Sequence, residues 1–432
     1  MNKKVLIVTY YWPPSGGSGV QRWLKFVKYL DQAGWETIVV TPGNPSFQMS
    51  DPSLLDDIPA KTEVVKLPIW EPYDTFYKIS GFFGKKKPGA MDMISTEKMS
   101  MSKRFISWVR GNMMIPDPRV FWVRPASKYL ADLIKARDID KIITTGPPHS
   151  IHLIGLRLKK KFPAVKWIAD FRDPWSEWDL LDTLMLSRAA RNRHRKLERT
   201  VLQEANRVIT IAPFHVKLFE KLGGRPVDLI TNGFDTDDFQ KVQRTKTQRF
   251  TIRHTGVVDE LRDPRPFMLA LKKFVEADPS VKGNVIIEFI GNVNSSFMTY
   301  VLGDPVLSSI TKFTSTIPHK ELLKLYGQTD LLLLVLAHTA AAPGNLPGKL
   351  FEYLASGIPI VAVGPVVGDA ADVIGKSGAG EIFERNDEAS MIAMLRKHFA
   401  MWKEGNIIST TDATPFTRKK LTDQLIGILE SL

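Results

Sequence analysis

Short apolar segments that alternate with helical segments constrain the fold of this chain most strongly. Residues 331–336 are apolar at every position, and residues 358–363 are almost as apolar. Strands buried on both faces read as unbroken apolar runs, so these segments predict strands of a parallel sheet. Leu350, Phe351 and Leu354 lie between them at helical spacing, which predicts the connecting helix. The pattern therefore predicts a doubly wound α/β fold.

The alternation occurs in two runs, which predicts two domains. The first run extends to about residue 240, after which the alternation resumes with a strand at 250–254. The segment 236–248 is polar and without periodicity, so it is interpreted as the interdomain linker. The second domain is predicted to span residues 241–414, and an amphipathic helix at 415–432 follows it. Ligands are expected at the carboxyl ends of the strands, with the two domains facing a cleft.

Composition narrows the classes of function. The 432 residues include no cysteine, which excludes disulfides, thiolate metal sites and a cysteine nucleophile. No apolar run approaches the ~18–20 residues of a transmembrane helix, and no signal peptide precedes the first strand, so a cytoplasmic location is expected. The net charge of +13 favours phosphorylated ligands, polyanions or an anionic membrane surface. No nucleic-acid-binding motif accompanies this charge, so nucleic acid is not an expected partner.

The segment 343–363 carries the clearest chemistry. Its helix is predicted to start near Gly348, where free amides of Gly348, Lys349 and Leu350 and the helix dipole would attract an anion. Lys349 adds a full positive charge, and Glu352 follows one turn later as an acceptor for sugar or ribose hydroxyls. Phosphate beside hydroxyls is the outline of a nucleotide sugar. The alternative is an ordinary βαβ unit with a surface lysine and glutamate.

The first domain offers weaker signals at the same edge of its sheet. Gly16 and Gly17 lie in a loop between a strand and a helix, but their spacing differs from the dinucleotide-binding fingerprint. His149 follows a predicted strand, and a structural role there is the alternative to a role in binding. Arg172 and Asp173 follow the next strand, where they could pair with each other or face substrate.

Two basic regions of the first domain have two interpretations each. The segment 68–125 mixes large apolar residues with arginines, as in an insertion packed on the domain or a segment that binds an acceptor or a membrane. The helix predicted at 187–204 is strongly basic. It could be a solvated face or a contact with an anionic membrane.

Four motifs carry a resemblance to a known family. They are Gly16-Gly17, the Asp-Phe-Arg-Asp-Pro-Trp segment at 170–175, the Asn-Gly-Phe-Asp segment at 232–235, and residues 347–359. Through them most of the chain resembles the retaining glycosyltransferases of family four, which have the GT-B fold. The last motif is the most specific. The chain is similar to the branch of that family that acts in cell-surface polysaccharide synthesis.

The resemblance implies an enzyme of the hexosyltransferase type. It implies transfer from a nucleoside-diphosphate-sugar donor to a glycan or lipid-linked acceptor, with retention at the anomeric carbon and without a metal or other cofactor. It also implies that the helix at 415–432 crosses back, so that the first domain comprises residues 1–240 and 415–432. An enzyme of this kind would be cytoplasmic, with peripheral contact to the inner face of the membrane as a further expectation.

Particular positions either match or depart from the family pattern. Glu352 matches the second of two glutamates that members of the family carry eight positions apart, and this second glutamate usually holds the ribose. Gly344 stands in place of the first. Members also carry an arginine and a lysine after the first strand of the second domain. Arg262 and Arg265 are the candidates for that role, because no lysine is present there.

These considerations predict two groups of site residues. The residues expected to act in catalysis are His149, Asp173, Arg262 and Lys349. The residues expected to bind the donor are Gly16, Gly17, Gly256, Arg265, Gly348, Leu350 and Glu352. Two other functions stay open, namely a sugar-nucleotide epimerase of the same fold and a non-catalytic homologue that binds nucleotide sugars.

Overall fold

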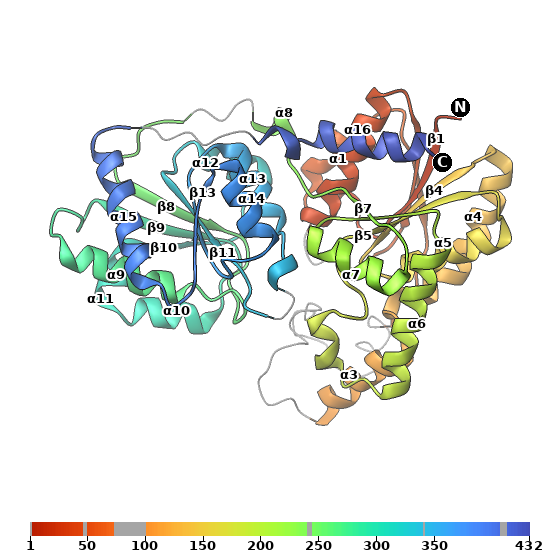
Figure 1. Cartoon of the computed structure of the whole chain (residues 1–432), viewed down its shortest axis with the longest axis horizontal. Coiled ribbons are helices and arrows are strands. Elements are labelled where there is room, and N and C mark those ends of the chain that lie inside the picture. Colours follow the sequence, from red (N-terminus) through yellow and green to blue (C-terminus); the bar gives the residue numbers. More distant parts are fainter. Residues whose placement is uncertain (1, 46–49, 73–100, 240–243, 340–341, 407–412) are drawn as a thin grey trace. The chain divides into compact units, whose positions relative to one another are not determined.

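The structure is a computed structural model of the whole chain, and its backbone divides into two compact units (Figure 1). It describes residues 2–45, 50–72, 101–239, 244–339, 342–406 and 413–432. The first unit comprises residues 1–231 and 421–432, and the second comprises residues 232–420. These boundaries lie within ten residues of those predicted from the sequence.

A seven-stranded parallel sheet forms the first unit, in the order β3-β2-β1-β4-β5-β6-β7. The strands are β1 (Lys4–Val8), β2 (Glu36–Pro42), β3 (Glu63–Leu67), β4 (Lys141–Gly146), β5 (Lys166–Phe171), β6 (Arg207–Thr210) and β7 (Asp228–Leu229). The strand order reverses between β1 and β4, and such a reversal opens a crevice at the carboxyl ends of the strands.

Helices cover both faces of this sheet. They are α1 (Ser18–Gln32), α3 (Met101–Met113), α4 (Val123–Arg137), α5 (Ser150–Lys161), α6 (Arg188–Glu204), α7 (Pro213–Gly223) and α16 (Arg418–Glu430). Short 3-10 helices complete the unit at η1 (Pro52–Asp57), η2 (Pro118–Trp122) and η3 (Asp179–Leu184). Alternate residues of each strand face opposite layers, so the sheet contributes to two separate apolar cores.

The C-terminal helix belongs to the first unit, as the resemblance implied. Leu421, Leu425 and Leu429 share one face of α16 and are buried in a core that also contains Val5 and Trp23. Figure 1 shows α16 lying along α1. The spacing of four residues places these leucines on one stripe of the helix, which explains why the segment is amphipathic.

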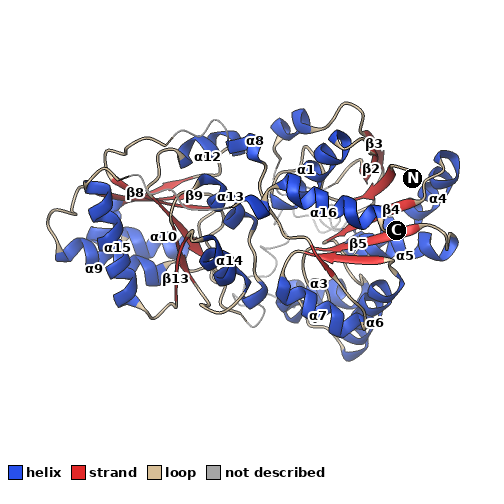
Figure 2. Cartoon of the chain, turned by 45° about the horizontal axis from the view of Figure 1, so that its top comes forward, coloured by secondary structure: helices blue, strands red, loops and turns tan. Residues whose placement is uncertain are grey.

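A six-stranded parallel sheet forms the second unit, in the order β10-β9-β8-β11-β12-β13. The strands are β8 (Phe250–Thr255), β9 (Val285–Ile290), β10 (Thr311–Thr314), β11 (Leu331–Val335), β12 (Ile360–Val363) and β13 (Gly380–Phe383). The order again reverses, here between β8 and β11. Figure 2 shows helices on both sides of each sheet, which confirms the predicted doubly wound α/β fold.

The helices of the second unit connect its strands in turn. They are α8 (Thr236–Phe239), α9 (Arg265–Ala277), α10 (Ser295–Leu302), α11 (Pro305–Ile310), α12 (His319–Tyr326), α13 (Gly348–Ser356), α14 (Asp369–Ser377) and α15 (Glu388–Lys403), with 3-10 turns at η4 (Ala342–Gly344) and η5 (Thr414–Phe416). The polar segment predicted as a linker therefore begins with a helical turn. Phe239 of that turn stacks on Tyr326, with ring centroids 6.4 Å apart, and this contact places it in the second unit.

Candidate functional site

The start of α13 lies beyond the carboxyl end of β11, where Gly348 and Lys349 are partly exposed. Its N-cap residue is Pro347, and no side chain caps the helix. The Leu350 amide donates to the Pro347 carbonyl at 3.0 Å, so this predicted donor is already used within the turn. The amides of Gly348 and Lys349 have no such bond to the described residues. Together with the helix dipole, these two amides form the anion-attracting end of α13.

Lys349 extends over the tip of β8. Its Nζ lies 3.4 Å from Nε2 of His254, and a Cβ at Gly256 would approach the same Nζ to 3.1 Å. Gly256 also has a φ of +106°, a left-handed conformation that favours glycine. Burial, with a further contribution from the positive charge of Arg262, lowers the pKa of Lys349 to about 7. Bringing an anion to this ammonium would therefore stabilise its charged form.

His254 fixes the direction of Lys349. The imidazole is fully buried, and its Nδ1 lies 2.9 Å from the carbonyl oxygen of Leu333. A carbonyl only accepts hydrogen bonds, so Nδ1 carries the proton and Nε2 is left to accept from the Lys349 ammonium. Burial, together with the nearby charge of Lys349, holds the pKa of His254 well below its usual value and keeps the ring neutral. The sequence placed His254 at the end of a strand but assigned it no role.

Glu352 lies one helical turn after Lys349 and is held by two side chains of α12. Its Oε1 is 3.2 Å from Nε2 of His319, and its Oε2 accepts from the Tyr326 hydroxyl at 3.4 Å. The carboxylate remains partly exposed, with 26% of its side-chain surface accessible. Residues three apart on a helix are neighbours, so the carboxylate and the Lys349 ammonium lie on the same side of α13.

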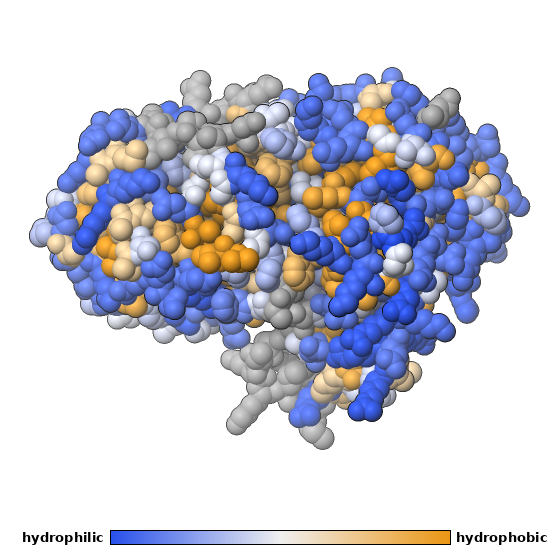
Figure 3. All heavy atoms as spheres, in the orientation of Figure 1, coloured by the Kyte–Doolittle hydropathy of each residue, from blue (hydrophilic) through white to orange (hydrophobic). Residues whose placement is uncertain are grey.

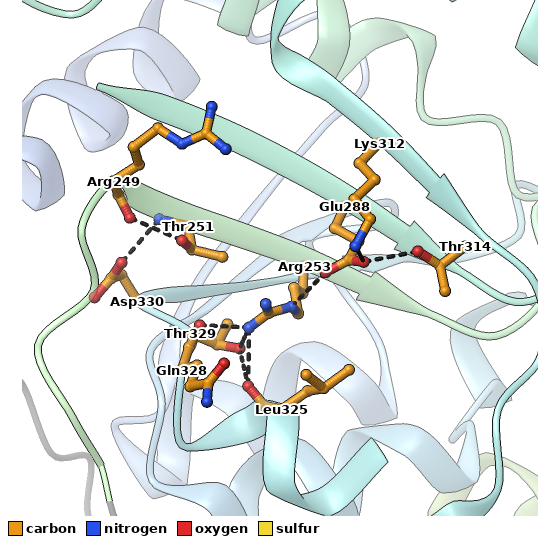
Figure 4. A network of polar contacts seen from close by, with 10 residues as sticks. All are labelled: Arg249, Thr251, Arg253, Glu288, Lys312, Thr314, Leu325, Gln328, Thr329 and Asp330. Carbon is orange, nitrogen blue, oxygen red and sulfur yellow. Dashed lines mark hydrogen bonds and ion pairs between the residues drawn. The ribbon is translucent and has the colours of Figure 1, made fainter. Parts of the chain in front are cut away.

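A network of charged and polar side chains contacts the end of α12 (Figure 4), and in it Arg253 and Glu288 are buried whereas Lys312 is exposed. Arg253 of β8 pairs with Glu288 of β9 at 2.9 Å, and Glu288 in turn pairs with Lys312 of β10 at 2.8 Å. Although burial raises the pKa of Glu288, hydrogen bonds from Lys312, Arg253 and Thr314 lower it to about 2. The three strands therefore carry a ladder of alternating charge across one face of the sheet.

Arg253 links this ladder to α12. Its Nη1 donates to the Leu325 carbonyl at 2.8 Å and to Thr329 Oγ1 at 2.6 Å, and it also contacts the Gln328 carbonyl. A cation at the carboxyl end of a helix satisfies orphan carbonyls and opposes the negative end of the dipole. The network thus anchors the helix whose side chains hold Glu352.

The two predicted arginines occupy different environments. Arg262 pairs with Asp259 at 2.6 Å, and its positive charge contributes to the lowered pKa of Lys349. Arg265 pairs with Asp263 at 3.0 Å, donates to Ser296 Oγ at 2.7 Å and lies over the Tyr300 ring. Arg262 is therefore associated with the α13 site, whereas the guanidinium of Arg265 is engaged by α10.

The strand ends of the first unit hold a different set of predicted residues. His149 is buried and stacked on Trp175, with ring centroids 5.4 Å apart and an interplanar angle of 7°. Its Nδ1 has no hydrogen-bond partner among the described residues. Burial and the neighbouring His152 hold its pKa well below the usual range, so the ring is neutral. Asp173, two residues before Trp175 in the chain, is exposed.

Arg172 and Asp170 serve the fold rather than an open site. Arg172 donates from Nε to the Gly146 carbonyl at 3.1 Å and from Nη2 to the Pro147 carbonyl at 2.5 Å. Asp170 is fully buried and pairs with Arg22 at 3.0 Å, with further bonds from the Trp23 indole and Thr145. The structure thus shows Arg172 bound to backbone carbonyls, a role that differs from the pairing with Asp173 that the sequence had left open.

The glycine loop of the first unit leads directly into a helix. Gly17 is the N-cap residue of α1, with a φ of +100° and no side-chain cap, and Gly16 precedes it. A side chain at Gly19 would collide with the Arg172 guanidinium. The first turn of α1 therefore lies against Arg172, which is bonded to the Gly146 carbonyl at the end of β4.

Solved structures resemble the chain over nearly its full length. A glycosyltransferase from Rickettsia africae aligns with a TM-score of 0.62 at 12% identity, covering 99% of this chain and 98% of that one. WaaG, a glycosyltransferase involved in lipopolysaccharide biosynthesis, aligns at 0.58 and 14% identity, covering 98% and 100%. An α,α-trehalose-phosphate synthase from Burkholderia xenovorans aligns at 0.62 and 11% identity, covering 99% and 100%.

Comparisons at the level of sequence find less. No family model matches the chain, and no curated protein matches it. At identities of 11–14%, the likeness to the solved structures concerns the fold and leaves the reaction open. The architecture of the chain is that of the GT-B glycosyltransferases.

Proposed function

We propose that this protein transfers a sugar from a nucleoside-diphosphate-sugar donor to a glycan or lipid-linked acceptor, with retention of the anomeric configuration. The observation that carries the proposal is the start of α13. An uncapped helix end, the Lys349 ammonium and the Glu352 carboxylate lie there within one turn. This combination suits a ligand with phosphate at one end and vicinal hydroxyls close by.

The donor diphosphate would bind to the amides of Gly348 and Lys349 and to the Lys349 ammonium, with Arg262 contributing charge. Hydrogen bonds to charged groups are each worth ~1.5–3 kcal/mol, and they strengthen as charge develops on the leaving diphosphate. Cationic side chains and a helix end would thus do what a metal ion does in other transferases, so we propose catalysis without a metal. Glu352 would accept hydrogen bonds from the ribose.

The acceptor would bind at the strand ends of the first unit. We propose that His149 and Asp173 bind donor-sugar or acceptor hydroxyls and that the loop at Gly16 and Gly17 approaches the reacting groups. Burial holds His149 neutral, and a neutral imidazole has one nitrogen that donates and one that accepts a hydrogen bond. No residue is assigned as a covalent nucleophile, since attack from the same face as departure also gives retention.

The solved relatives support the classes of donor and acceptor. One E. coli protein of similar fold is described as bound to UDP-2-fluoro glucose, and WaaG is described as acting in lipopolysaccharide biosynthesis. A second candidate function has support of the same kind. A structure from Listeria monocytogenes described as a putative UDP-N-acetylglucosamine 2-epimerase aligns with a TM-score of 0.56 at 10% identity.

Donor binding is tested by a thermal-shift screen of nucleoside diphosphates and their sugars, because a ligand that binds only the folded state raises the melting temperature. We expect one nucleotide family to stabilise the wild type, and Lys349→Ala or Glu352→Ala to remove most of the shift. Lys376→Ala, which removes an exposed lysine of α14, is the matched control. Wild-type shifts and transfer rates in both site variants would contradict the assignment of the nucleotide site.

Turnover separates the three functions. With donor and acceptor glycans, release of nucleoside diphosphate together with a product that keeps the anomeric configuration is expected. Isomerised sugar nucleotide formed without any acceptor would instead identify an epimerase. Binding without turnover on any acceptor tested would identify a non-catalytic homologue.

A further inference from the structure

The helix α3 contacts other described parts of the first unit through one of its faces. Ser107 donates to the Thr183 carbonyl at 3.3 Å, and Asn112 donates to the Met185 carbonyl at 3.2 Å. A side chain at Gly111 would collide with Leu184, so the backbone of α3 lies close against η3 at this point. Small and polar residues thus form the attached side of the helix.

Several large apolar side chains lie elsewhere on α3, which also carries Arg104 and Arg110. Phe105 is 64% exposed, Trp108 is 43% exposed and Met113 is 70% exposed. Phe105, Val109 and Met113 follow each other at intervals of four residues, which places them on one stripe. Isolated apolar residues at a protein surface are ordinary, but a contiguous stripe on one helix marks an interaction surface.

The adjoining helix α6 presents a stripe of positive charge. Its exposed cations are Arg188, Arg193, Arg195, Lys196 and Arg199. Arg195 pairs with Glu177 at 3.3 Å, whereas the other four have no acidic partner among the described residues. Acidic side chains of this region are the buried Glu198 and the exposed Glu204 of α6 itself, together with Glu177 and Asp182, and Asp182 pairs with Arg191.

The two stripes meet where the helices touch. The Ser187 amide donates to Asn112 of α3 at 2.8 Å, and the next residue, Arg188, begins the line of cations. In Figure 3 hydrophilic surface dominates over α6, and hydrophobic surface appears beside it at the end near α3. The surface therefore combines apolar insertion with positive charge, and we name it the α3–α6 surface.

We propose that the α3–α6 surface binds an anionic membrane, with the apolar stripe of α3 in the interfacial layer and the cations of α6 on lipid phosphates. A nucleic acid would bind the cations of α6 but would leave the apolar stripe of α3 exposed to water. A membrane surface engages both. The proposal goes beyond the proposed transferase function and does not depend on it, because binding to lipid needs neither donor nor acceptor.

The electrostatic half is tested by flotation of the full-length protein with phosphatidylcholine vesicles that contain or lack phosphatidylglycerol. Each cation near an anionic surface contributes roughly fivefold to partitioning, so Arg188→Ala/Lys196→Ala/Arg199→Ala should weaken binding about 100-fold. The matched control is Lys282→Ala/Lys376→Ala/Lys397→Ala, which removes the same charge from exposed positions of the second unit. It should bind as the wild type does. High salt should weaken vesicle binding by the wild type and by both triple variants.

The apolar half is tested with Phe105→Ser/Met113→Ser. We expect about tenfold weaker partitioning at fixed salt, because both side chains leave water on binding. Thermal melting of each variant verifies that these exposed changes leave the fold intact. Absence of binding to anionic vesicles at low salt would overturn the proposal. Vesicle binding by the triple variant of α6 at the wild-type level would also overturn it. So would a double variant of α3 that binds vesicles as the wild type does, if the wild type bound RNA or heparin more tightly than vesicles.

Discussion

The strand ends of the two units use their charged residues in opposite ways. At the end of β5, the Arg22–Asp170 pair is fully buried and Arg172 is bonded to backbone carbonyls. At the start of α13, Lys349 has a lowered pKa, its one polar side-chain contact among the described residues is the neutral His254, and Glu352 stays partly exposed. Topology places both groups at ligand-binding edges. The comparison teaches that a charge is available to a ligand only where the fold has not already neutralised it.

The largest expected effect is on the stability of the first unit. Asp170→Ala leaves the Arg22 guanidinium buried without its carboxylate, and removing one partner of a buried ion pair costs about 3–5 kcal/mol. Denaturant unfolding should show a loss of this size. Arg191→Ala, which breaks the exposed pair with Asp182, is the control and should change stability by less than about 1 kcal/mol. A loss below that level for Asp170→Ala would show that the first unit does not depend on this pair.

The next effect is expected in the second unit, where one buried charge supports the site. Arg253→Met removes the bonds to the end of α12 and one partner of Glu288, so we expect a loss of about 2–3 kcal/mol and weaker nucleotide binding. Lys312→Met breaks an exposed contact of the same glutamate and should cost less than about 1 kcal/mol. Stability is measured by denaturant unfolding and binding by calorimetry. If Arg253→Met lowered stability but left nucleotide affinity unchanged, α12 would not position Glu352.

Lys349→Met should separate stability from binding. The folded-state pKa of Lys349, about 7, lies below its unfolded value of 10.5, so the unfolded chain binds more protons between these pH values. The variant should therefore be more stable than the wild type, with the full gain below pH 7 and none above about pH 10.5. Donor affinity should fall about 10- to 100-fold, the equivalent of one charged hydrogen bond.

Thermal unfolding from pH 6 to pH 10 and calorimetric titration with a nucleoside diphosphate measure the two effects. A variant that is destabilised at pH 6 would show that Lys349 contributes to the fold, as Arg22 does. In that case the contrast between the two strand ends would fail.

The smallest effect is expected at the partner of Glu352. His319→Ala removes one partly exposed contact, and exposed pairs are worth about 0.2–1 kcal/mol. We expect a change of at most about fivefold in nucleotide affinity, because Tyr326 still holds the other oxygen. Glu352→Gln provides the larger reference effect in the same titration. A loss with His319→Ala that equals the loss with Glu352→Gln would show that the histidine itself contacts the nucleotide.

Several parts of the fold were predictable because their physics is local. The buried strands β11 and β12 read directly as apolar runs, and the leucines of α16 repeat at helical spacing. The edge strands β10 and β13 were not predicted. Both are four residues long and partly exposed at the margins of the sheet, so their composition resembles that of a loop. For the same reason α8 was interpreted as linker, since its single turn is recognised by its contact with Tyr326 rather than by periodicity.

The sequence by itself determined the two doubly wound sheets and the anion-attracting turn at Gly348 and Lys349, because apolar runs, helix starts and glycine turns act between near neighbours. Only the tertiary structure decided which charges are free. In the folded chain Asp170 forms an ion pair with Arg22, Arg172 donates to backbone carbonyls, and Lys349 is oriented by its contact with His254. Each of these pairings joins residues that are 25 to 148 positions apart in the chain. No local pattern encodes such contacts, since they depend on which strand ends the sheet brings together.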